Sequence, residues 1–209
     1  MTLSCVVCTI AGAPDAGERG NIYSVGLPYA ARGWALRNLT LPWLSRMGFK
    51  ELIVTGQWEQ GPGYHYIKVP EVYRNIGDLL LQRQAGYDLS TGDWVLYLND
   101  DTIWDPSNPL PADLECQVLS PSRWSRAATP YGSPLNDGSM ASSPYNEEDY
   151  VHFHATLVRR EVTQRIPWVT LPPEPGVDVL FSMRLNYEGI PWRHAPEYKV
   201  WDIELGARI

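Results

Sequence analysis

The sequence predicts an α/β fold with a parallel, Rossmann-like half, and three observations support this prediction. Over residues 1–101, apolar runs of strand length alternate with longer segments of helical periodicity. The run over residues 94–99 is almost wholly apolar and aromatic, as expected for a strand covered on both faces of a sheet. It leads directly into Asp100 and Asp101, and ligand sites of open α/β sheets lie at such carboxyl ends of strands.

The acidic triplet Asn99-Asp100-Asp101 is the first candidate site. Two adjacent carboxylates repel each other, so a bound partner must offset that cost. A divalent cation bound to a phosphate does so, because hard cations take oxygen ligands. The alternative interpretation is an acidic turn that caps the next segment.

Hydrophobic patterning predicts the other elements of this half. We expect strands over residues 3–10, 51–55 and 64–69, and helices over residues 34–47 and 75–89. Pro42 lies inside the first helix and predicts a kink or a break there. The connection over residues 11–33 is longer than usual for a loop between a strand and a helix.

Cys5 and Cys8 form a C-x-x-C pattern, but they lie in the expected first strand. A separation of three residues in a strand puts the two side chains on opposite faces. They therefore share neither a metal nor a disulfide, and we interpret them as small buried apolar residues.

The second half of the chain has a different composition. Residues 102–149 are rich in Pro, Ser, Gly and Asn, with a short strand expected near residues 117–119. The segment 129–149 is long and poor in apolar residues, which favours a flexible loop that acts as a lid. His152 and His154 then lie two apart, on one face of the next expected strand, where we prefer an acceptor-site or core role over zinc binding.

Arg83-Gln84-Ala85-Gly86 is followed by Gly92, the hydrophobic strand and the acidic triplet. In this order the motifs resemble the GT-A-type glycosyltransferases, in particular the family-two-like group. The family carries Arg-Asn-x-Gly, a second Gly, a hydrophobic strand and a DxD-type motif in this order. Gln84 stands where the family usually has Asn, and Asn99 stands where it usually has the first Asp.

A second match lies near the C-terminus. Asp178 and Arg184 keep the six-residue spacing of the family's Glu-Asp and Arg, on a helix that ends at Gly189, while Val177 replaces the Glu. Asp178 is expected at the start of this helix, where backbone N–H groups favour a carboxylate. The alternative is that Asp178 is only an N-cap.

The resemblance implies a GT-A-like fold with a mixed central sheet in a single domain. Residues 1–101 would form the nucleotide-sugar-binding half and residues 102–209 the acceptor half. The implied roles are donor binding for Thr9, Arg32, Arg83, Asn99 and Asp100, metal binding for Asp101 and His194, acceptor binding for His154 and Arg184, and general-base catalysis for Asp178. For two of these residues the alternatives are a solvated residue at a helix start (Arg32) and a surface salt bridge (Arg83).

The expected activity is transfer of a sugar from a nucleotide-sugar, UDP-linked, to an acceptor hydroxyl with Mn²⁺ or Mg²⁺ on the donor diphosphate. A glycan, a protein or modified phage DNA are the acceptors considered. Two alternatives remain open. One is a nucleotidyltransferase, which shares the acidic metal site, and the other is a binding module without catalytic activity.

Composition limits these options. The chain has 209 residues, 44% of them hydrophobic, and a net charge of −7, which argues against tight non-specific binding of nucleic acid. A local basic patch is the sequence argument for a DNA acceptor. The patch would consist of Arg123, Arg126, Arg159, Arg160 and Arg165.

No signal peptide or membrane span is visible, so a cytoplasmic location is expected.

Overall fold

The structure is a computed structural model that describes residues 1–9, 33–70, 76–109, 111, 115–128, 139–140, 150–153, 155–174 and 176–205. Its strands are β1 (Leu3–Thr9), β2 (Glu51–Gly56), β3 (His65–Lys68), β4 (Trp94–Asn99), β5 (Thr102–Trp104), β6 (Val118–Ala128), β7 (Ser139–Met140), β8 (Ala155–Arg159) and β9 (Trp192–Leu205). Its helices are η1 (Leu36–Thr40), α2 (Leu41–Leu44), α3 (Ile76–Leu89), α4 (Arg160–Arg165), η2 (Trp168–Thr170) and α5 (Val177–Tyr187).

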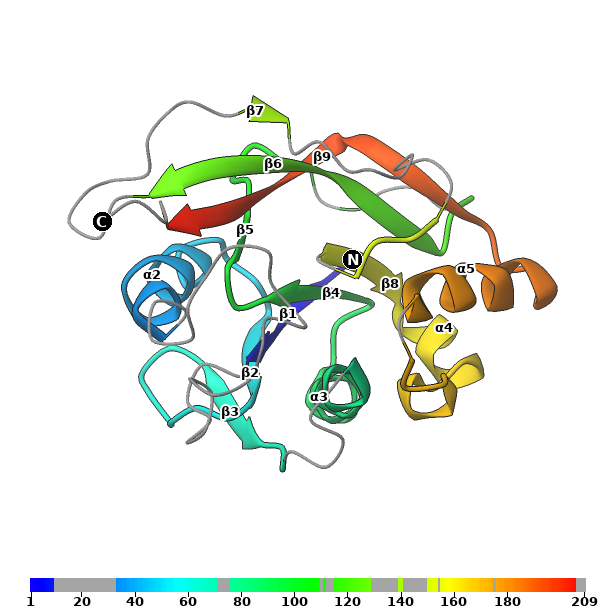
Figure 1. Ribbon diagram of the computed structural model, residues 1–209, viewed down its shortest axis with the longest axis horizontal. Coiled ribbons are helices and arrows are strands. Elements are labelled where there is room, and N and C mark those ends of the chain that lie inside the picture. The colour runs from blue at the N-terminus through cyan, green and yellow to red at the C-terminus, as the bar shows by residue number, and fades with distance from the viewer. Residues whose placement is uncertain are drawn as a thin grey trace.

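These strands form one mixed sheet in the order β3-β2-β1-β4-β8-β6-β9-β5, with β7 paired to β6. The first four are parallel, as the alternation of strands and helices predicts. Beyond β4 the sheet is mixed, because β8 runs antiparallel to both β4 and β6, while β6 and β9 are parallel. In Figure 1, β6 and β9 cross above the parallel strands.

Two hydrophobic cores cover the two faces of the sheet. The helical turns of η1 and α2 contribute to one core, and α3, α4 and α5 contribute to the other (Figure 1). Side chains of β1 alternate between them, since Cys5 and Val7 join the first core and Val6 and Cys8 join the second. The prediction that Cys5 and Cys8 point to opposite faces is therefore confirmed, and both are free thiols.

The expected irregularity near Pro42 takes the form of a change of helix type. Leu36–Thr40 is a π-helical turn, and α2 begins directly after it with Pro42 near its start. Proline lacks the N–H that would continue the ladder, and it is tolerated in the first turn of a helix.

One strand is longer than the sequence predicts, and another has no counterpart in the sequence prediction. The short strand expected near residues 117–119 is an 11-residue strand, β6, with a register shift between Pro121 and Ser122. The C-terminal stretch forms β9, a 14-residue strand that pairs with β6 and β5. The two strands are stabilised by each other, since their pairing extends from Val118 to Ala128.

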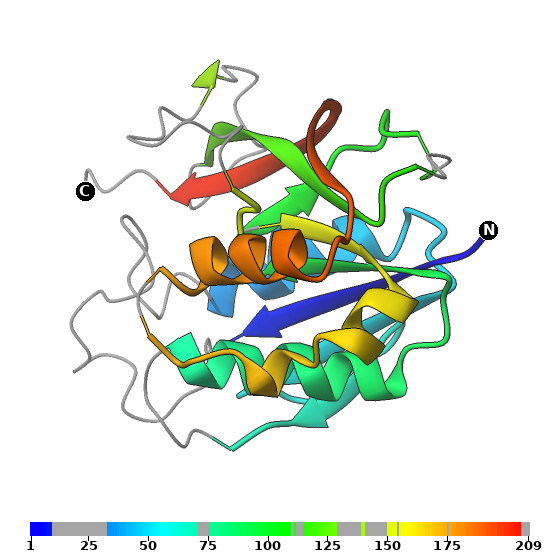
Figure 2. The same cartoon turned by 90° about the vertical axis from the view of Figure 1, so that its right-hand side faces the viewer.

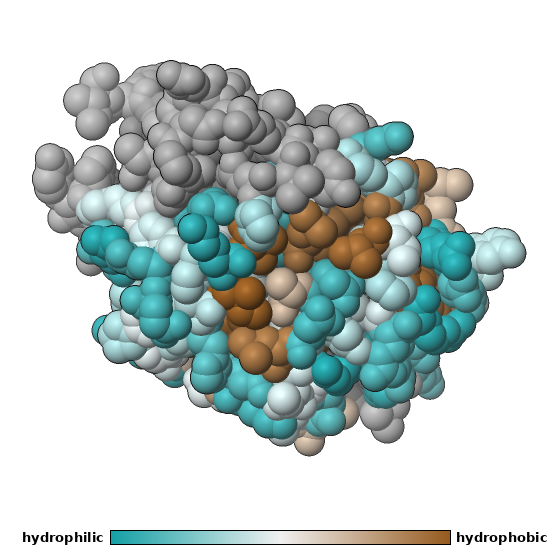
Figure 3. Space-filling model, turned by 90° about the horizontal axis from the view of Figure 1, so that it is seen from below, coloured by the Kyte–Doolittle hydropathy of each residue, from teal (hydrophilic) through white to brown (hydrophobic). Residues whose placement is uncertain are grey.

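The face formed by β3 and α3 is mostly hydrophilic, with an apolar patch near its centre (Figure 3). Large hydrophobic side chains exposed elsewhere include Val179, Met183 and Tyr187 of α5. Within the described residues, no helix is both long and apolar enough to cross a membrane.

Candidate active site

The carboxyl edge of the parallel strands gathers the predicted site. β1 ends at Thr9 and β4 ends at Asn99, and the two strands pair in register at Cys8 and Asn99. Figure 2 shows that α3 and α5 both begin at the edge where the arrowhead of β1 lies. This edge is where open α/β sheets bind their ligands.

Asp100 is a buried carboxylate that joins three elements. Its Oδ2 accepts a 2.8 Å hydrogen bond from the Thr9 hydroxyl, and its carbonyl accepts a 2.9 Å bond from the Thr40 hydroxyl of η1. Both threonines are also buried. These contacts give Asp100 a structural role at the ends of β1 and β4, and its predicted contact with the donor stays a prediction.

Asp101 is the carboxylate of the triplet that reaches the surface. Asp100 is fully buried, whereas Asp101 and Asn99 are each half-buried. A carboxylate oxygen at this edge has the chemistry that Mn²⁺ or Mg²⁺ requires, so Asp101 fits as one protein ligand of a cation whose other ligands are phosphate oxygens and water.

Arg83 of α3 is 0% exposed and lies in an aromatic cage. Its guanidinium carbon is 4.3 Å from the ring centroid of Phe153, 4.9 Å from Trp168 and 5.2 Å from Tyr97. Its Nη2 donates a hydrogen bond to the carbonyl of Phe153. Such cation–π contacts partly offset the cost of burying a charge.

The glycine of the Arg83 motif explains how this arginine reaches the site. A Cβ on Gly86 would lie 2.3 Å from Cγ1 of Val6, so α3 packs against β1 more closely than any larger residue allows. Arg83, almost one turn earlier on α3, is then close enough for its charge to act on Cys8 near the end of β1. The Arg-x-x-Gly spacing therefore places a cation at the carboxyl edge.

Gln84, which stands where the resembled family has Asn, helps to close the cage. Its Oε1 accepts a 3.0 Å hydrogen bond from the backbone N–H of Trp168, the first residue of η2. Its Nε2 donates to Asp88 one turn later on α3. The contact fixes the start of η2 over α3 and so holds the Trp168 ring beside Arg83.

Asp178 is the second residue of α5 and is half-buried. The N-cap position belongs to Gly176, whose φ of 80° lies in the left-handed region, so the interpretation of Asp178 as the N-cap is wrong. Burial raises the pKa of Asp178 above its ordinary value, although the Val179 N–H, which lies 3.0 Å from Oδ1, and the charge of Arg83 act in the opposite direction. A carboxylate with a raised pKa is a stronger base than a free one.

His194 lies on β9, apart from Asp101. It pairs with Ser120 of β6, and its Nε2 is 3.2 Å from the Ser122 hydroxyl. Asp101 is followed by Thr102 of β5, which pairs with Asp202 of β9, and Asp202 pairs with Ser125 of β6. Ser125 and Ser120, the partner of His194, are five residues apart on β6, or about 16 Å along the strand.

In the described part of the chain, no group of three or more His, Cys, Asp and Glu side chains is placed to hold a metal. The structure therefore brings Thr9, Arg83, Asp100 and Asp178 to one edge without bringing His194 to Asp101. The metal roles of Asp101 and His194 remain predictions.

Arg184 lies on the exposed side of α5. Its Nη2 is 2.6 Å from a carboxylate oxygen of Glu188, and its guanidinium lies over the Tyr187 ring at 5.6 Å. This ion pair joins α5 to the residue that caps its C-terminus, and the acceptor role of Arg184 remains a prediction. Arg32, His154 and the segment 129–149 expected to form a lid lie outside the described residues.

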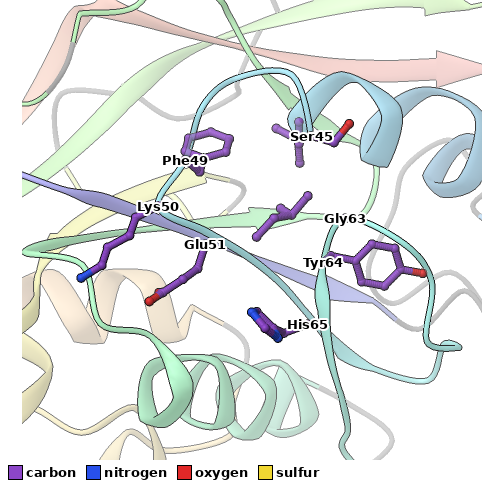
Figure 4. A pocket seen from close by; sticks show the side chains of 9 residues that line it. Ser45, Phe49, Lys50, Glu51, Gly63, Tyr64 and His65 are labelled. Atoms are coloured by element: carbon purple, nitrogen blue, oxygen red, sulfur yellow. The ribbon is translucent and has the colours of Figure 1, made fainter.

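One pocket of about 370 Å³ lies at the opposite end of the sheet (Figure 4). It is lined by residues where β2 and β3 begin, among them Glu51, Tyr64 and His65. Glu51 is engaged there by the Ser4 hydroxyl at 2.6 Å and by the Thr91 N–H at 2.9 Å. This pocket is therefore separate from the carboxyl edge that carries the candidate active site.

Sequence reasoning missed the aromatic cage and the polar contacts beneath it. Tyr97, Phe153 and Trp168 come from three separate segments, and no local pattern relates them to Arg83. The available signal was the composition, with nine Trp and twelve Tyr in the chain.

Comparison with solved structures identifies the fold. A mannosyltransferase, PcManGT from Pyrobaculum calidifontis in complex with GDP-Man and Mn²⁺, superposes with a TM-score of 0.55 at 13% identity. GalNAc-T7 with UDP, GalNAc and Mn²⁺ superposes with a TM-score of 0.56 at 12% identity. Both are GT-A-type glycosyltransferases. The protein has the GT-A fold.

The same GT-A fold spans part of the larger neighbours. The alignments cover 99% and 98% of this chain but only 57% of PcManGT and 44% of GalNAc-T7. The inositol-1-phosphate CTP transferase from T. maritima also superposes, with a TM-score of 0.54 at 14% identity, over 99% of this chain and 91% of that one. No sequence-family model and no curated protein sequence matches this chain.

Proposed function

We propose that this protein transfers a sugar from a nucleotide-sugar, UDP-linked, to an acceptor hydroxyl. One observation carries the proposal: Asp178, whose half-buried carboxyl has a raised pKa, lies in the first turn of α5 at the same sheet edge where β4 ends in the acidic triplet. A base and an acidic, cation-compatible group at one edge match the two needs of glycosyl transfer. These needs are activation of the acceptor and stabilisation of the departing diphosphate.

Asp101 would hold the cation, Mn²⁺ or Mg²⁺, at the end of β4. A bound divalent cation supplies Lewis-acid stabilisation of the charge that develops on the diphosphate. Asn99, also half-buried at this edge, would contact the donor ribose, for which an amide offers both a donor and an acceptor. Asp100 would support them by holding the strand end through Thr9 and Thr40.

Asp178 would remove the proton from the acceptor hydroxyl during attack on the anomeric carbon. A sugar hydroxyl keeps its proton at neutral pH, so the attacking oxygen needs a nearby base as the new bond forms. The carboxylate of Asp178 is kept in a low-polarity environment by burial, which increases its basicity. This is an inverting scheme, with the base on the side opposite to the leaving group.

Two of the similar structures support the donor class. PcManGT was solved with GDP-Man and Mn²⁺, and GalNAc-T7 with UDP, GalNAc and Mn²⁺. For this chain we propose a donor of the same class and an acceptor on a macromolecule, either a glycan or a protein.

The basic patch expected for a DNA acceptor receives less support. Arg160 donates from Nη1 to the Ser90 carbonyl and lies over the Tyr87 ring. Arg165 donates to the Glu188 carbonyl at 2.9 Å. Arg159 lies 3.6 Å from Glu161 and over Trp94. All three arginines have partners within their own chain, which favours the glycan or protein acceptor.

A second candidate function is nucleotidyl transfer to a sugar phosphate. The T. maritima CTP transferase supports it, since it aligns over 91% of its own length, more than either glycosyltransferase. The two reactions release different products from the nucleotide, which makes them separable.

The test begins with a thermal-shift screen of nucleotide-sugars and nucleoside triphosphates, each with and without Mn²⁺. We expect Mn²⁺-dependent stabilisation by UDP-sugars. The UDP that is released when acceptor or water is consumed is then measured by ³¹P NMR, after the metal has been chelated. Release of pyrophosphate from a nucleoside triphosphate would instead establish the nucleotidyltransferase. Lack of stabilisation by every nucleotide-sugar, with and without metal, would contradict the proposed donor class.

A further inference from the structure

Arg83 is a buried cation whose hydrogen-bonding capacity is only partly used. Nη2 binds the Phe153 carbonyl, but Nε and Nη1 are buried without a hydrogen-bond partner among the described residues. An unpaired buried charge is costly, and the aromatic cage offsets only part of that cost. The position of this cation therefore requires a further electrostatic partner.

Asp178 is the carboxyl group that acts electrostatically on Arg83. Three titratable groups act on Arg83 within the described structure, namely Cys8, Tyr97 and Asp178. Burial raises the pKa of Cys8 to about 11 and raises the pKa of Tyr97 above its ordinary value, so both are neutral near pH 7. Asp178 is the one carboxyl group of this set, and its carboxylate is the charge that favours the protonated guanidinium of Arg83.

A second set of contacts links the same two residues through the segment 150–153. Phe153, at one end, accepts the hydrogen bond from Arg83. Val151 donates a 2.8 Å bond from its N–H to the Ser182 hydroxyl, and Ser182 donates a 2.9 Å bond to the carbonyl of Asp178. The first turn of α5 and the guanidinium of Arg83 are therefore tied to one short segment.

Packing reinforces this link. Phe181, almost one turn after Asp178, contacts two walls of the cage, with ring centroids 4.9 Å from Trp168 and 5.7 Å from Phe153. The face of α5 that carries Phe181 therefore rests on the same rings that enclose Arg83.

We propose that Arg83 is a positioning residue that keeps Asp178 ionised for catalysis, and that Ser182 holds the first turn of α5 in register with it. The inference deepens the proposed function and rests on it. It differs from the donor contact that the family resemblance implies, because a guanidinium enclosed by three rings acts through its charge.

The proton balance shows why such a partner is useful. In the transfer step the acceptor O–H bond breaks and its proton passes to the Asp178 carboxylate. The acceptor oxygen bonds to the anomeric carbon, and the bond from that carbon to the diphosphate breaks with its electron pair on the diphosphate. Burial makes Asp178 a better base, whereas Arg83 keeps it from being protonated before the reaction.

The test combines an NMR titration with a pH profile. The carboxyl carbon of Asp178 is assigned by comparing ¹³C-Asp-labelled wild type with Asp178→Asn and is then titrated in wild type, Arg83→Lys and Arg83→Met. We expect Arg83→Met to move the Asp178 midpoint to higher pH, because the attraction that favours the charged form is lost. Arg83→Lys keeps a charge and should stay near wild type. The acid limb of the kcat/KM profile should move in the same direction as the midpoint.

Controls separate this role from its alternatives. Arg37→Met removes an exposed arginine paired with Glu59 and should leave the Asp178 titration unchanged. His152→Gln removes a second titratable side chain from the segment 150–153 and should leave the same midpoint in place. Further charged groups on the elements around Asp178 are Glu174, Arg184 and Glu188.

Ser182→Ala keeps the charge of Arg83 and provides the test if Arg83→Met does not fold. We expect kcat to fall, by up to about 10²-fold for a misplaced base, with the acid limb unmoved. An unchanged Asp178 midpoint in Arg83→Met, or an equal shift in Arg83→Lys, would overturn the proposal. A raised donor KM with an unmoved midpoint would assign Arg83 to the donor instead. If the midpoint shifts but no sugar is transferred, the proposed function fails while the Arg83–Asp178 relation holds.

Discussion

Thr9 and Asp100, 91 residues apart in the chain, are joined by a 2.8 Å hydrogen bond from the Thr9 hydroxyl to the Asp100 carboxylate. The bond connects the last residue of β1 to the residue that follows β4. It thus aligns two strand ends that would carry the donor.

Replacing Thr9 with Val should destabilise the protein, because the shape is kept while a buried carboxylate loses a donor. We expect a loss of about 1–3 kcal/mol in the free energy of unfolding, measured by urea denaturation. Thr55→Val is the matched control, since the Thr55 hydroxyl lies 3.4 Å from the Val7 carbonyl in the same sheet. Equal losses of unfolding free energy in the two variants would show that the Thr9–Asp100 hydrogen bond contributes no more to stability than the weaker Thr55 contact.

Asp178→Asn should preserve the fold and remove the base. We expect kcat for transfer to fall by about 10²–10⁴-fold, with donor affinity nearly constant and little change in melting temperature. Single-turnover transfer measured beside Glu174→Gln, an exposed carboxylate just before α5, provides the comparison. Transfer at the wild-type rate in Asp178→Asn would remove the general-base assignment and point to a retaining mechanism or to another base.

Asp101→Asn should abolish the Mn²⁺-dependent part of UDP binding, because the amide is a weaker ligand for a hard cation. Calorimetry with UDP, with and without Mn²⁺, measures the effect. Asp93→Asn is the control, since this exposed aspartate lies just before β4 at the other end of the strand. His194→Gln in the same series decides whether the histidine of β9 takes part. Unchanged metal dependence in Asp101→Asn would exclude Asp101 from the metal site.

Gly86→Ala should destabilise the protein by overpacking. The added Cβ would lie 2.3 Å from Val6 Cγ1, so α3 must move away from β1, at a cost of about 1–3 kcal/mol. Combining it with Val6→Ala should cost less than the sum of the single variants, since the second change removes the clashing methyl groups. Strict additivity in this double-mutant cycle would contradict the close packing of α3 on β1.

Glu51 should contribute to the loss of stability in acid. Burial raises its pKa, but hydrogen bonds from Ser4 and Thr91 outweigh this and leave the pKa below its ordinary value. Its contribution is therefore present above the unfolded-state pKa and is lost as the pH falls through the folded-state pKa. Glu51→Gln should flatten the decline in unfolding free energy below about pH 5, whereas Glu59→Gln, at an exposed ion pair, should not.

The parallel half could be predicted because its signals are local. The run over residues 94–99 is apolar at every position but the last, which is the pattern that a strand buried on both faces requires. The period of two in β1 was enough to separate Cys5 from Cys8. The acidic triplet marked the edge of the sheet for the same reason, since a buried strand cannot continue through two carboxylates.

The second half of the chain, from residue 102 onward, could not be predicted in the same way. β6 reads Val-Leu-Ser-Pro-Ser-Arg-Trp-Ser-Arg-Ala-Ala, with proline and charged residues that disfavour a strand, and its conformation depends on pairing with β9. The cage around Arg83 was hidden because Phe153 lies 70 residues away in sequence and meets Arg83 only in the folded chain. Sequence reasoning found the arginine and its spacing, and the fold revealed its surroundings.

The outermost strands in the sheet order, β3 and β5, have four and three residues. Strands of this length present few unpaired backbone groups to another molecule, and β3 also begins and ends with exposed polar side chains, His65 and Lys68. Short edge strands discourage edge-to-edge recruitment of further chains, and the exposed polar ends of β3 add to this effect. The protein thus protects a large and strongly apolar sheet from aggregation at both ends of its described strand order.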